Sequence, residues 1–253
     1  MTKNFFIILA LITSFRVQAQ ITQQTTGSCA KTGTTSTCKW FFDSTSGTLS
    51  ITGHGLMEDY QRKSEEYTTA PWYQYHNEIK NIIVADGITN ISENAFALTA
   101  VQNVNLPNSI IKIDKGGFYY CTNLSSIKLP QNLENIGDIA FTYSGLQSVD
   151  IPESVSNIGT QAFAIRSLKS INLPDSVNLG YLIFWELGEE HPVQNFQIYC
   201  KGKIKVCEEK VRNNALYPFD YSFKIYRKNH RIYTIEEANA VSGDKNRVSI
   251  TYR

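Results

Sequence analysis

The chain contains 253 residues, of which 42% are apolar and 19% charged, and its 24 basic and 23 acidic side chains leave a formal net charge of +1. This is the composition of a globular protein, and it excludes wholesale disorder and a polybasic nucleic-acid-binding protein. Five cysteines are too few for a scaffold held together mainly by disulfides.

The first 19 residues have the pattern of a secretory signal peptide. Lys3 gives a positive start, residues 5–12 form an apolar run too short to cross a bilayer comfortably, and Val-Gln-Ala at 17–19 provides a small-residue cleavage site. Cleavage after Ala19 removes Lys3, Arg16 and no acid, which leaves 22 basic against 23 acidic side chains. We therefore expect export to the periplasm, the cell surface or the medium, with no membrane span after cleavage and no nucleic-acid partner.

Export changes how the cysteines are interpreted, because disulfides persist in oxidising compartments. Cys29 lies close to Cys38 in sequence and Cys200 lies close to Cys207, so we expect these two pairs to be bonded. Such short loops contribute about 2–3 kcal/mol each at best through chain entropy, which makes them local staples. Cys121 is left over and is expected to be a small buried apolar residue. No Cys-x-x-Cys pair exists and the histidines are scattered, so we expect no metal site.

Residues 20–78 are expected to form a linker followed by an N-terminal β cap. Residues 20–28 are rich in Gln and Thr, which is typical of a mobile linker. Residues 39–43 and 48–52 flank a Ser-Thr-Ser-Gly turn and predict a β-hairpin that covers the N-terminal end of the core.

Five units repeat from residue 79 to about residue 190. Each contains a phenylalanine, at positions 96, 118, 141, 163 and 184, with spacings of 22, 23, 22 and 21 residues. Prolines at 107, 130, 152 and 174 keep the same period. A unit of this size cannot bury its apolar positions alone, so a period of this kind predicts units that stack on a continuous core.

The pattern inside a unit predicts its local structure. Each unit opens with Leu-x-x-Ile-x-Leu, whose last two apolar residues alternate as in a short strand, and the following proline ends that strand. A second apolar pair follows, such as Leu133 and Ile136, and then Ala-Phe, which we expect to pack one short helical turn opposite the strands. Burial of six large apolar side chains per unit contributes on the order of 10 kcal/mol before entropy. The sequence therefore predicts an α/β repeat solenoid.

The units resemble the BspA-like leucine-rich repeats of bacterial surface and secreted proteins. The shared pattern is Leu-x-x-Ile-x-Leu-Pro-x-Ser-Val-x-x-Ile-Gly-x-x-Ala-Phe, sometimes followed by x-x-Cys, as in residues 118–121. The resemblance covers a little under half of the chain and implies a right-handed leucine-rich-repeat-like stack with a parallel β-sheet and a role in binding or adhesion. The first unit lacks the proline, the second has Gly117 in place of Ala, and the fifth is one residue short, so the repeats are not fully regular.

Residues 191–253 are expected to form a C-terminal cap and a small αβ module. Within it, residues 196–200, 224–233 and 248–252 have strand patterns, and residues 206–214 have the pattern of a short helix. Residues 234–237 (Thr-Ile-Glu-Glu) have the spacing of a capping box, which predicts that a helix begins there.

The stacked strands would expose the residues that lie between their apolar positions. These residues form two polar ladders along one face, and they are the binding-face candidates Asn103, Asn105, Ser126, Lys128, Ser148, Asp150, Ser170 and Asn172. Stacked repeats offer extended surfaces of this kind to a protein or a glycan. The alternative is that the ladders are only the solvated side of a half-buried sheet.

A second set of candidates is aromatic. The residues that follow the repeat phenylalanines include Tyr119, Tyr120, Tyr143 and Trp185, and residues 72–75 (Trp-Tyr-Gln-Tyr) precede the first unit. Exposed Tyr and Trp side chains can anchor a partner. The alternative is that these rings pack between turns or under the caps.

The sequence gives little support for catalysis. It contains no Gly-x-Ser-x-Gly elbow, no phosphate-binding glycine loop, no His-Glu-x-x-His and no calcium-loop spacing, so we expect no catalytic residue, no cofactor and no metal. The leading hypothesis is a non-enzymatic, exported repeat protein that binds a protein or glycan partner through the solenoid face, in adhesion or another surface interaction. A scaffold that organises partners of its own cell is the main alternative, and a glycan-handling enzyme is a weaker one.

Overall fold

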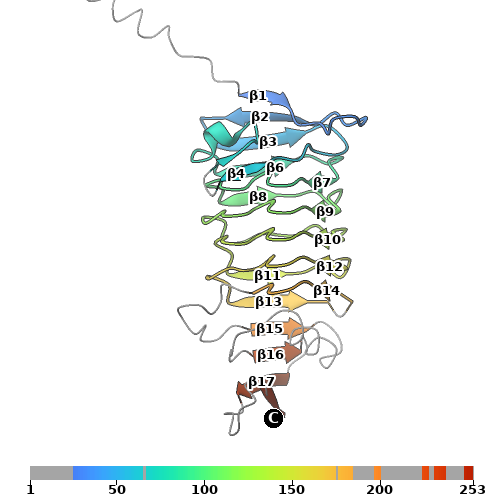
Figure 1. The fold of residues 1–253 in the computed structure, drawn as a ribbon, viewed down its shortest axis with the longest axis vertical. Coiled ribbons are helices and arrows are strands. Elements are labelled where there is room, and N and C mark those ends of the chain that lie inside the picture. Colours follow the sequence, from blue (N-terminus) through green and yellow to red (C-terminus); the bar gives the residue numbers. More distant parts are fainter. Residues whose placement is uncertain are drawn as a thin grey trace, which may run out of the picture.

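The computed structural model describes residues 25–64, 67–174, 176–184 and 197–200, and the backbone of three strands at 224–227, 231–237 and 248–252. In this part of the chain, short strands stack along one axis in chain order (Figure 1). Within the described ranges the one helix is a single 3-10 turn, η1 (Tyr73–Tyr75). The expectation of an α/β class is therefore wrong in its helical part, because the described repeats are built from strands and turns.

The first sheet contains the predicted hairpin, but a short strand at residues 26–28 precedes it. The expectation of a mobile linker is therefore wrong for these three residues, because their backbone pairs with residues 39–41. It has the strand order β1-β2-β3-β6-β8 and consists of β1 (Thr26–Ser28), β2 (Lys39–Asp43), β3 (Thr48–Thr52), β6 (Asn81–Val84) and β8 (Asn103–Asn105). The pairs β1–β2 and β2–β3 are antiparallel, and the pairs β3–β6 and β6–β8 are parallel. Trp40, Phe42, Leu49 and Ile51 alternate with more exposed residues and are buried, so the hairpin covers the end of the core as predicted.

The C-terminal sheet has the strand order β11-β13-β15-β16-β17-β18. Its strands are β11 (Ser148–Asp150), β13 (Ser170–Leu173), β15 (Gln197–Cys200), β16 (Lys224–Arg227), β17 (Arg231–Glu237) and β18 (Val248–Tyr252). The strands pair in parallel from β11 to β16, and β16–β17 and β17–β18 are antiparallel. The predicted strands at 196–200 and 248–252 are thereby confirmed.

Two predictions for this C-terminal region are wrong. The single strand expected over 224–233 is split between β16 and β17, and the helix expected to begin at residue 234 is instead the second half of β17. Residues 232–235 (Ile-Tyr-Thr-Ile) are all β-branched or aromatic, and this composition favours a strand over the helix suggested by the capping-box spacing. The short helix predicted at 206–214 lies outside the described residues.

A second parallel sheet, which the sequence pattern did not reveal, runs along the stack. Its strands have two residues each and the order β14-β12-β10-β9-β7: β7 (Asn90–Ile91), β9 (Lys112–Ile113), β10 (Asn135–Ile136), β12 (Asn157–Ile158) and β14 (Asn178–Leu179). Glycine follows three of these strands because neighbouring repeats approach closely there. A Cβ atom on Gly159 would lie 2.4 Å from the backbone N of Asp138. A separate two-stranded sheet pairs β4 (Arg62–Ser64) with β5 (Tyr67–Thr68).

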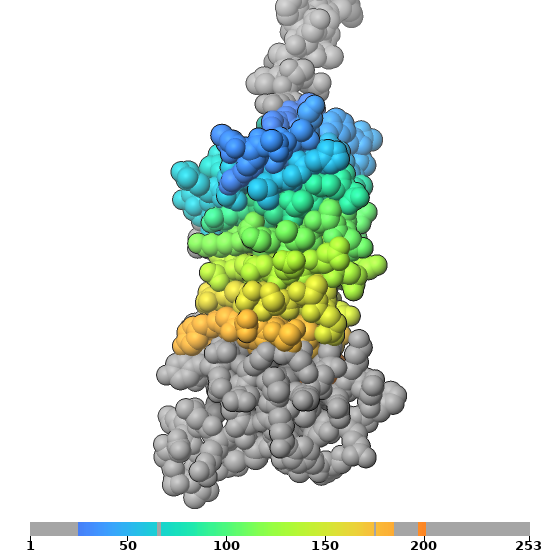
Figure 2. Space-filling model, turned by 90° about the vertical axis from the view of Figure 1, so that its right-hand side faces the viewer, coloured from blue at the N-terminus to red at the C-terminus, as the bar shows by residue number. Residues whose placement is uncertain are grey.

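The segments around the repeat phenylalanines form a third side of the stack, which we call the turn side. The N–H groups of the phenylalanines at 96, 118, 141 and 163 each donate to the carbonyl just before the next phenylalanine, at 2.8–3.0 Å. The residue two positions before each phenylalanine has a left-handed φ between 49° and 64°: Asn94, Gly116, Ile139, Gln161 and Leu182. A left-handed residue interrupts right-handed helical winding, so each repeat has a tight turn here where a helical turn was expected. Figure 2 shows the repeats as successive layers in chain order.

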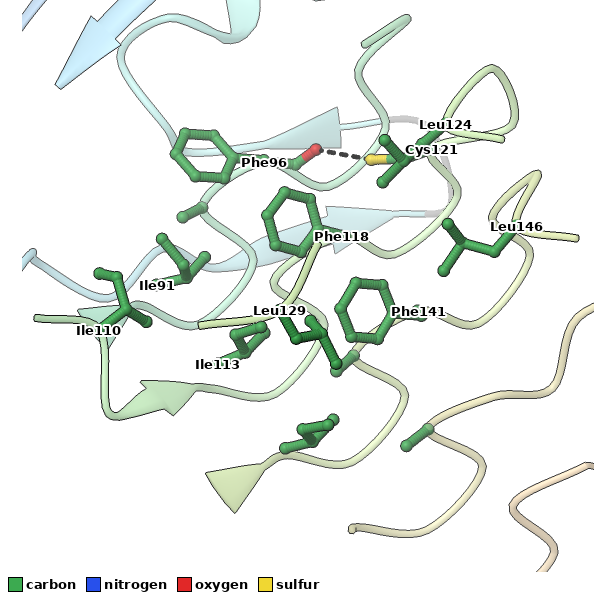
Figure 3. Close-up of a cluster of buried hydrophobic side chains, with 14 of the residues drawn as sticks. Ile91, Phe96, Ile110, Ile113, Phe118, Cys121, Leu124, Leu129, Phe141 and Leu146 are labelled. Atoms are coloured by element: carbon green, nitrogen blue, oxygen red, sulfur yellow. Dashed lines mark hydrogen bonds between the residues drawn. The ribbon is translucent and has the colours of Figure 1, made fainter. Parts of the chain in front are cut away.

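Stacked aromatic rings form the centre of the core. The aromatic column consists of Trp72, Phe96, Phe118, Phe141 and Phe163, and the centroids of consecutive rings are 5.8, 5.5, 5.4 and 5.3 Å apart. Each of these side chains is fully buried, and isoleucines and leucines surround the rings (Figure 3). Cys121 lies in the same core as a free thiol, as predicted, and its Sγ donates to the Phe96 carbonyl at 3.1 Å.

The main ladder of strands is interrupted at the third repeat. Residues 124–129 were expected to form a strand, but they do not, so the first sheet ends at β8 and the C-terminal sheet begins separately at β11. In this repeat Leu124 lies six positions after Phe118, whereas the equivalent apolar residue lies five positions after the phenylalanine in the neighbouring repeats. We attribute the lost register to this extra residue. The second sheet and the turn side continue through the same repeat.

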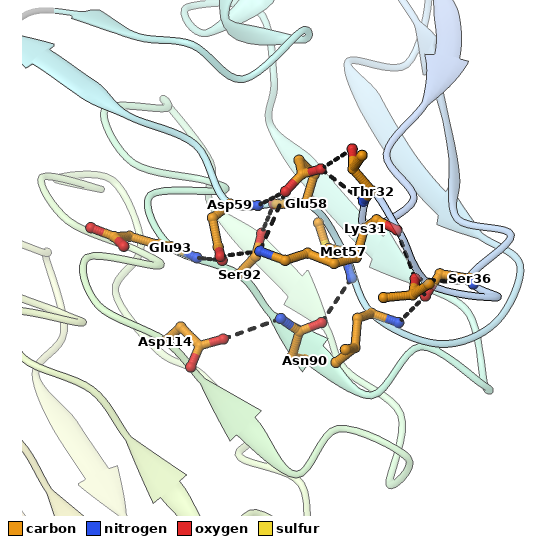
Figure 4. Close-up of polar contacts among 12 residues, drawn as sticks. Lys31, Thr32, Ser36, Met57, Glu58, Asp59, Asn90, Ser92, Glu93 and Asp114 are labelled. Carbon is orange, nitrogen blue, oxygen red and sulfur yellow. Dashed lines mark hydrogen bonds and ion pairs between the residues drawn. The ribbon is translucent and has the colours of Figure 1, made fainter.

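Polar contacts fasten the N-terminal cap, which we define as residues 25–68, to the first repeats (Figure 4). Within the cap, Lys31 forms ion pairs with Glu58, at 3.3 Å, and with Asp59. Ser92 of the first repeat donates from its hydroxyl to the Glu58 carbonyl. The amide group of Asn90 accepts a hydrogen bond from the Met57 N–H at 2.9 Å. It also donates to an Asp114 carboxylate oxygen at 3.1 Å. Side chains thus add specific contacts to the backbone ladder between β3 and β6, which also joins the cap to the first repeat.

Candidate functional site

The eight binding-face candidates lie on one side of the chain but not on one sheet. Asn103 and Asn105 are exposed on β8, and Ser148 and Asp150 are exposed on β11. Ser170 and Asn172 continue the columns of β11 in register on β13, where they are half-buried. Ser126 and Lys128 are exposed on the segment between the two sheets, which is not a strand. We call these eight positions the sheet face. The sheet face also includes the positions of β2, β3 and β6 that pair in register with the candidates on β8.

Two apolar side chains that the sequence analysis missed lie on the same sheet face. Phe41 on β2 is 50% exposed, and Ile83 on β6 is 45% exposed. Ser50 pairs with Phe41 on one side and with Ile83 on the other, and Ile83 pairs in turn with Asn105. The signal was present in the alternation, because Phe41 lies between the buried residues Trp40 and Phe42.

The electrostatic character of the sheet face is mixed. Lys128 and Asp150 bring opposite charges to it, and asparagines occupy several of the remaining positions. The Asn103 amide donates to the Asn81 side-chain oxygen at 3.0 Å, which holds these two side chains along the ladder. The N-terminal end of the face therefore has two apolar side chains among polar and charged ones such as Lys39, and the middle of the face is polar. Neither sign of charge dominates these positions.

The four aromatic candidates differ in their positions. Tyr119 is buried, with the Arg62 guanidinium carbon 3.9 Å from its ring centroid, so its role is packing. Tyr120 is 47% exposed, and Tyr143 is half-buried beside it with ring centroids 5.8 Å apart. Trp185 lies outside the described residues.

The rings before the first repeat are also divided between core and surface. Trp72 is in the aromatic column, and its indole N–H donates to the Ala95 carbonyl at 2.7 Å. Tyr75 is buried and stacks on Phe42 at 4.5 Å. Tyr73 is half-buried and stacks on His76 at 4.4 Å, so it alone of the three reaches the turn-side surface.

The cysteine predictions are confirmed where the described residues test them. Cys29 and Cys38 form a disulfide, with their Cα atoms 4.9 Å apart. Cys200 is also disulfide-bonded, while Cys207 lies outside the described residues, so the pairing of these two stays a prediction. Burial raises the pKa of the Cys121 thiol to about 12, so this cysteine is not a reactive nucleophile.

Titratable groups do not gather into a metal or catalytic cluster within the described part of the chain. No group of three or more His, Cys, Asp or Glu side chains there has the geometry to hold a metal ion. Glu58 has a pKa of about 2, chiefly because Thr32 donates to its carboxylate from both its hydroxyl and its N–H. This lowered pKa reflects hydrogen bonds within the N-terminal cap. Among the same residues, no helix has the length and hydropathy that a membrane crossing requires.

The repeats resemble those of known proteins in sequence. Residues 70–187 match the sequence profile of the BspA type leucine rich repeat region, in six copies. The repeat region belongs to this family. The first of the six copies therefore begins nine residues before the first unit that we recognised in the sequence, in the segment that supplies Trp72 to the aromatic column.

The fold is similar to that of a solved bacterial leucine-rich repeat protein. A leucine-rich repeat protein from Eubacterium ventriosum is 23% identical with a TM-score of 0.52, and the match covers 80% of this chain and 45% of that chain. The T. pallidum leucine rich repeat protein is 21% identical with a TM-score of 0.40, over 56% of this chain and 71% of that chain. This chain thus spans less than half the length of the first structure. No protein of curated function matches the sequence.

Proposed function

We propose that this protein is an exported, non-enzymatic binding protein that holds a protein partner on its sheet face. The observation that carries the proposal is the exposed pair Phe41 and Ile83, which flank Ser50 in one register column and lead into the polar positions of the same face. Protein interfaces combine a few apolar anchors with a polar rim in this way.

The mixed charge of the face supports a protein partner over a polyanion. Lys128 and Asp150 carry opposite charges, and the remaining candidates on the face are neutral Asn and Ser side chains. A nucleic acid or another polyanion is bound through clustered cations, which this face does not present among its described residues. A protein surface with its own mixture of polar groups is a better electrostatic match.

Two features support export. The first 19 residues have the signal-peptide pattern, and the Cys29–Cys38 disulfide suits an oxidising compartment. An exported chain with this sheet face suits a surface or secreted protein that takes part in adhesion. Such a protein would act by binding alone, without a cofactor, and the absence of catalytic motifs from the sequence agrees with that role.

The experiment is a capture assay with the mature chain, residues 20–253, as bait. Host extracellular-matrix proteins form one prey set, and the envelope fraction of the source cells forms the other. We expect saturable capture of a matrix protein, weakened about tenfold or more by the double variant Phe41→Ala/Ile83→Ala. The variants Lys128→Ala and Asp150→Ala should have smaller effects because they lie towards the polar rim.

Ile111→Ala provides a matched control, because Ile111 is also exposed, at 37%, but immediately precedes β9 on the second sheet. An equal loss of capture from Ile111→Ala would contradict a specific role for the sheet face. Capture of envelope proteins alone would favour a scaffold of the cell's own partners. Loss of binding only when the chain is truncated after residue 220 would move the site to the C-terminal module.

A further inference from the structure

Two shallow hollows lie next to each other on the turn side. The first, of about 520 Å³, is lined by Tyr73, His76, Tyr120 and Asn123 among others. The second, of about 600 Å³, is lined by Tyr120, Tyr143, Ser144 and Arg166 among others. Tyr120 and Thr122 line both, so the hollows form one elongated groove with the Tyr120 ring at its middle.

The groove runs along the axis of the stack. Its lining extends from Tyr73, next to Trp72 at the start of the aromatic column, to residues 166–167, just after Phe163 at its end. Four steps separate the first and last rings of that column. With strands about 4.8 Å apart, four steps correspond to a length of about 20 Å, which suits a chain-like ligand better than a compact one.

The Tyr120 and Tyr143 rings are held in place from below. Both residues have a left-handed φ of 58°, and their N–H groups donate to the carbonyls of Thr142 and Ala164 at 2.8 and 3.0 Å. The buried Tyr119 ring contacts both, with centroids 6.1 Å from Tyr120 and 5.8 Å from Tyr143. The groove therefore presents its aromatic surface in a fixed orientation, which lowers the entropy cost of binding.

The left-handed backbone makes a tyrosine an unusual choice at position 120. Glycine or asparagine adopts this conformation at a lower cost, but the turn imposes the same left-handed φ at Leu98 and Tyr143, so the backbone alone does not mark a site. Burial does not explain the side chain, because the Tyr120 ring remains 47% exposed. An aromatic ring that the core leaves exposed at this turn is explained if the ring contacts a ligand.

We infer that this groove binds an extended, uncharged oligosaccharide. A sugar ring has apolar C–H faces and a rim of hydroxyl groups, so it stacks on a tyrosine ring and exchanges hydrogen bonds with neighbouring polar groups. The groove supplies tyrosine rings together with Thr122, Asn123 and Ser144. None of the described residues that line it is acidic, and Arg166 is the single Lys or Arg among them.

A peptide that adds a strand is a poorer match for the same groove. The backbone N–H groups of Leu98, Tyr120 and Tyr143 already donate to the next repeat, so they cannot pair with an incoming strand. Recognition must therefore use side chains, which is how a groove of tyrosine rings and hydroxyl groups binds a glycan. This site is separate from the sheet face, so it stands or falls independently of the proposed protein partner.

The test uses the mature chain and a panel of uncharged hexasaccharides: β-1,4-glucan, β-1,4-xylan, α-1,4-glucan and N-acetylglucosamine oligomers. We expect isothermal titration calorimetry to detect binding of at least one, and Tyr120→Asn to weaken it about tenfold or more. Asparagine tolerates a left-handed φ, so this variant removes the ring without adding backbone strain. Tyr120→Phe should retain most of the affinity because it keeps the stacking surface.

Tyr181→Asn is the matched control, since Tyr181 is equally exposed, at 47%, and does not line either hollow. The inference is overturned if no hexasaccharide of the panel binds, or if Tyr120→Asn and Tyr181→Asn weaken binding equally. It is also overturned if Tyr120→Asn abolishes capture of the protein partner while Phe41→Ala/Ile83→Ala does not, because the groove would then be a protein site.

Discussion

The N-terminal cap and the repeats that follow it close the same kind of core by different means. In the repeats, equivalent residues meet across neighbouring units. One phenylalanine ring stacks on the next, and the phenylalanine N–H of one turn donates to a carbonyl of the next turn. In the cap, the ion pairs of Lys31, the hydrogen bond from the Met57 N–H to Asn90 of the first repeat, and a disulfide are contacts that occur once. The comparison teaches that regular repeats spread their stability over many equivalent contacts, whereas a cap concentrates it in a few specific ones.

The largest expected loss of stability comes from removing a ring of the aromatic column, compared with removing an exposed ring. Phe118→Ala leaves a cavity between Phe96 and Phe141, and we expect it to lower the free energy of unfolding by about 3–5 kcal/mol in urea. Phe41→Ala removes the same type of side chain from the exposed face of the hairpin. This variant should change the free energy of unfolding by less than about 1 kcal/mol. Similar losses from both variants would contradict a column that carries the core.

The next largest loss of stability is expected where neighbouring repeats approach most closely. Gly159→Ala places a Cβ atom 2.4 Å from the Asp138 backbone N and should cost about 3 kcal/mol, measured as a lower urea midpoint. Gly33 in the cap has no atom within 4 Å of such a Cβ, although its φ is +76°. Gly33→Ala should therefore cost about 1 kcal/mol, through backbone strain alone. The comparison fails if the cap variant is the more damaging one.

Removing the cap disulfide should act locally. The double variant Cys29→Ala/Cys38→Ala releases a short loop, and we expect it to cost about 2–3 kcal/mol at best. Hydrogen exchange should accelerate in residues 25–60 and remain unchanged around Phe141. Faster exchange throughout the stack would show that cap and repeats unfold as one unit.

The smallest effect is a pH dependence confined to the cap. The folded-state pKa of Glu58, about 2, lies below its ordinary value of 4.5, so its stabilising contribution is complete above pH 4.5 and is lost as the pH falls from 4.5 towards 2. Its side chain is 32% exposed, so solvent screening keeps the effect below about 1 kcal/mol. Chemical unfolding of the wild type and of Thr32→Ala at pH 6 and pH 3 measures this contribution. Between these two pH values, the free energy of unfolding should change less for Thr32→Ala than for the wild type.

Sequence reasoning succeeded where one pattern is repeated. The phenylalanine period identified the stack, the hairpin alternation located β2 and β3, and Cys29 and Cys38 were paired correctly. It failed where neighbouring repeats decide the structure. The Asn-Ile pairs of the second sheet are too short to be recognised as strands alone, and their pairing is visible only once the repeats are aligned in space.

The candidate surfaces divide in the same way. The exposed positions of the sheet face follow from strand alternation, so most of them could be named from the sequence. The groove could not, because it depends on which of two adjacent tyrosines points inward. Tyr119 is buried and Tyr120 is exposed, and the left-handed turn that decides this has no glycine to mark it.

The missing strand at residues 124–129 has a mechanical consequence. The stack behaves as a rod with three sides, two of which are continuously hydrogen-bonded while the third is broken at this one level. Bending that opens the broken side separates few hydrogen bonds, whereas bending in other directions must stretch an intact ladder. The rod is therefore most compliant at its third repeat and in one direction, with the second sheet and the turn side acting as its spine.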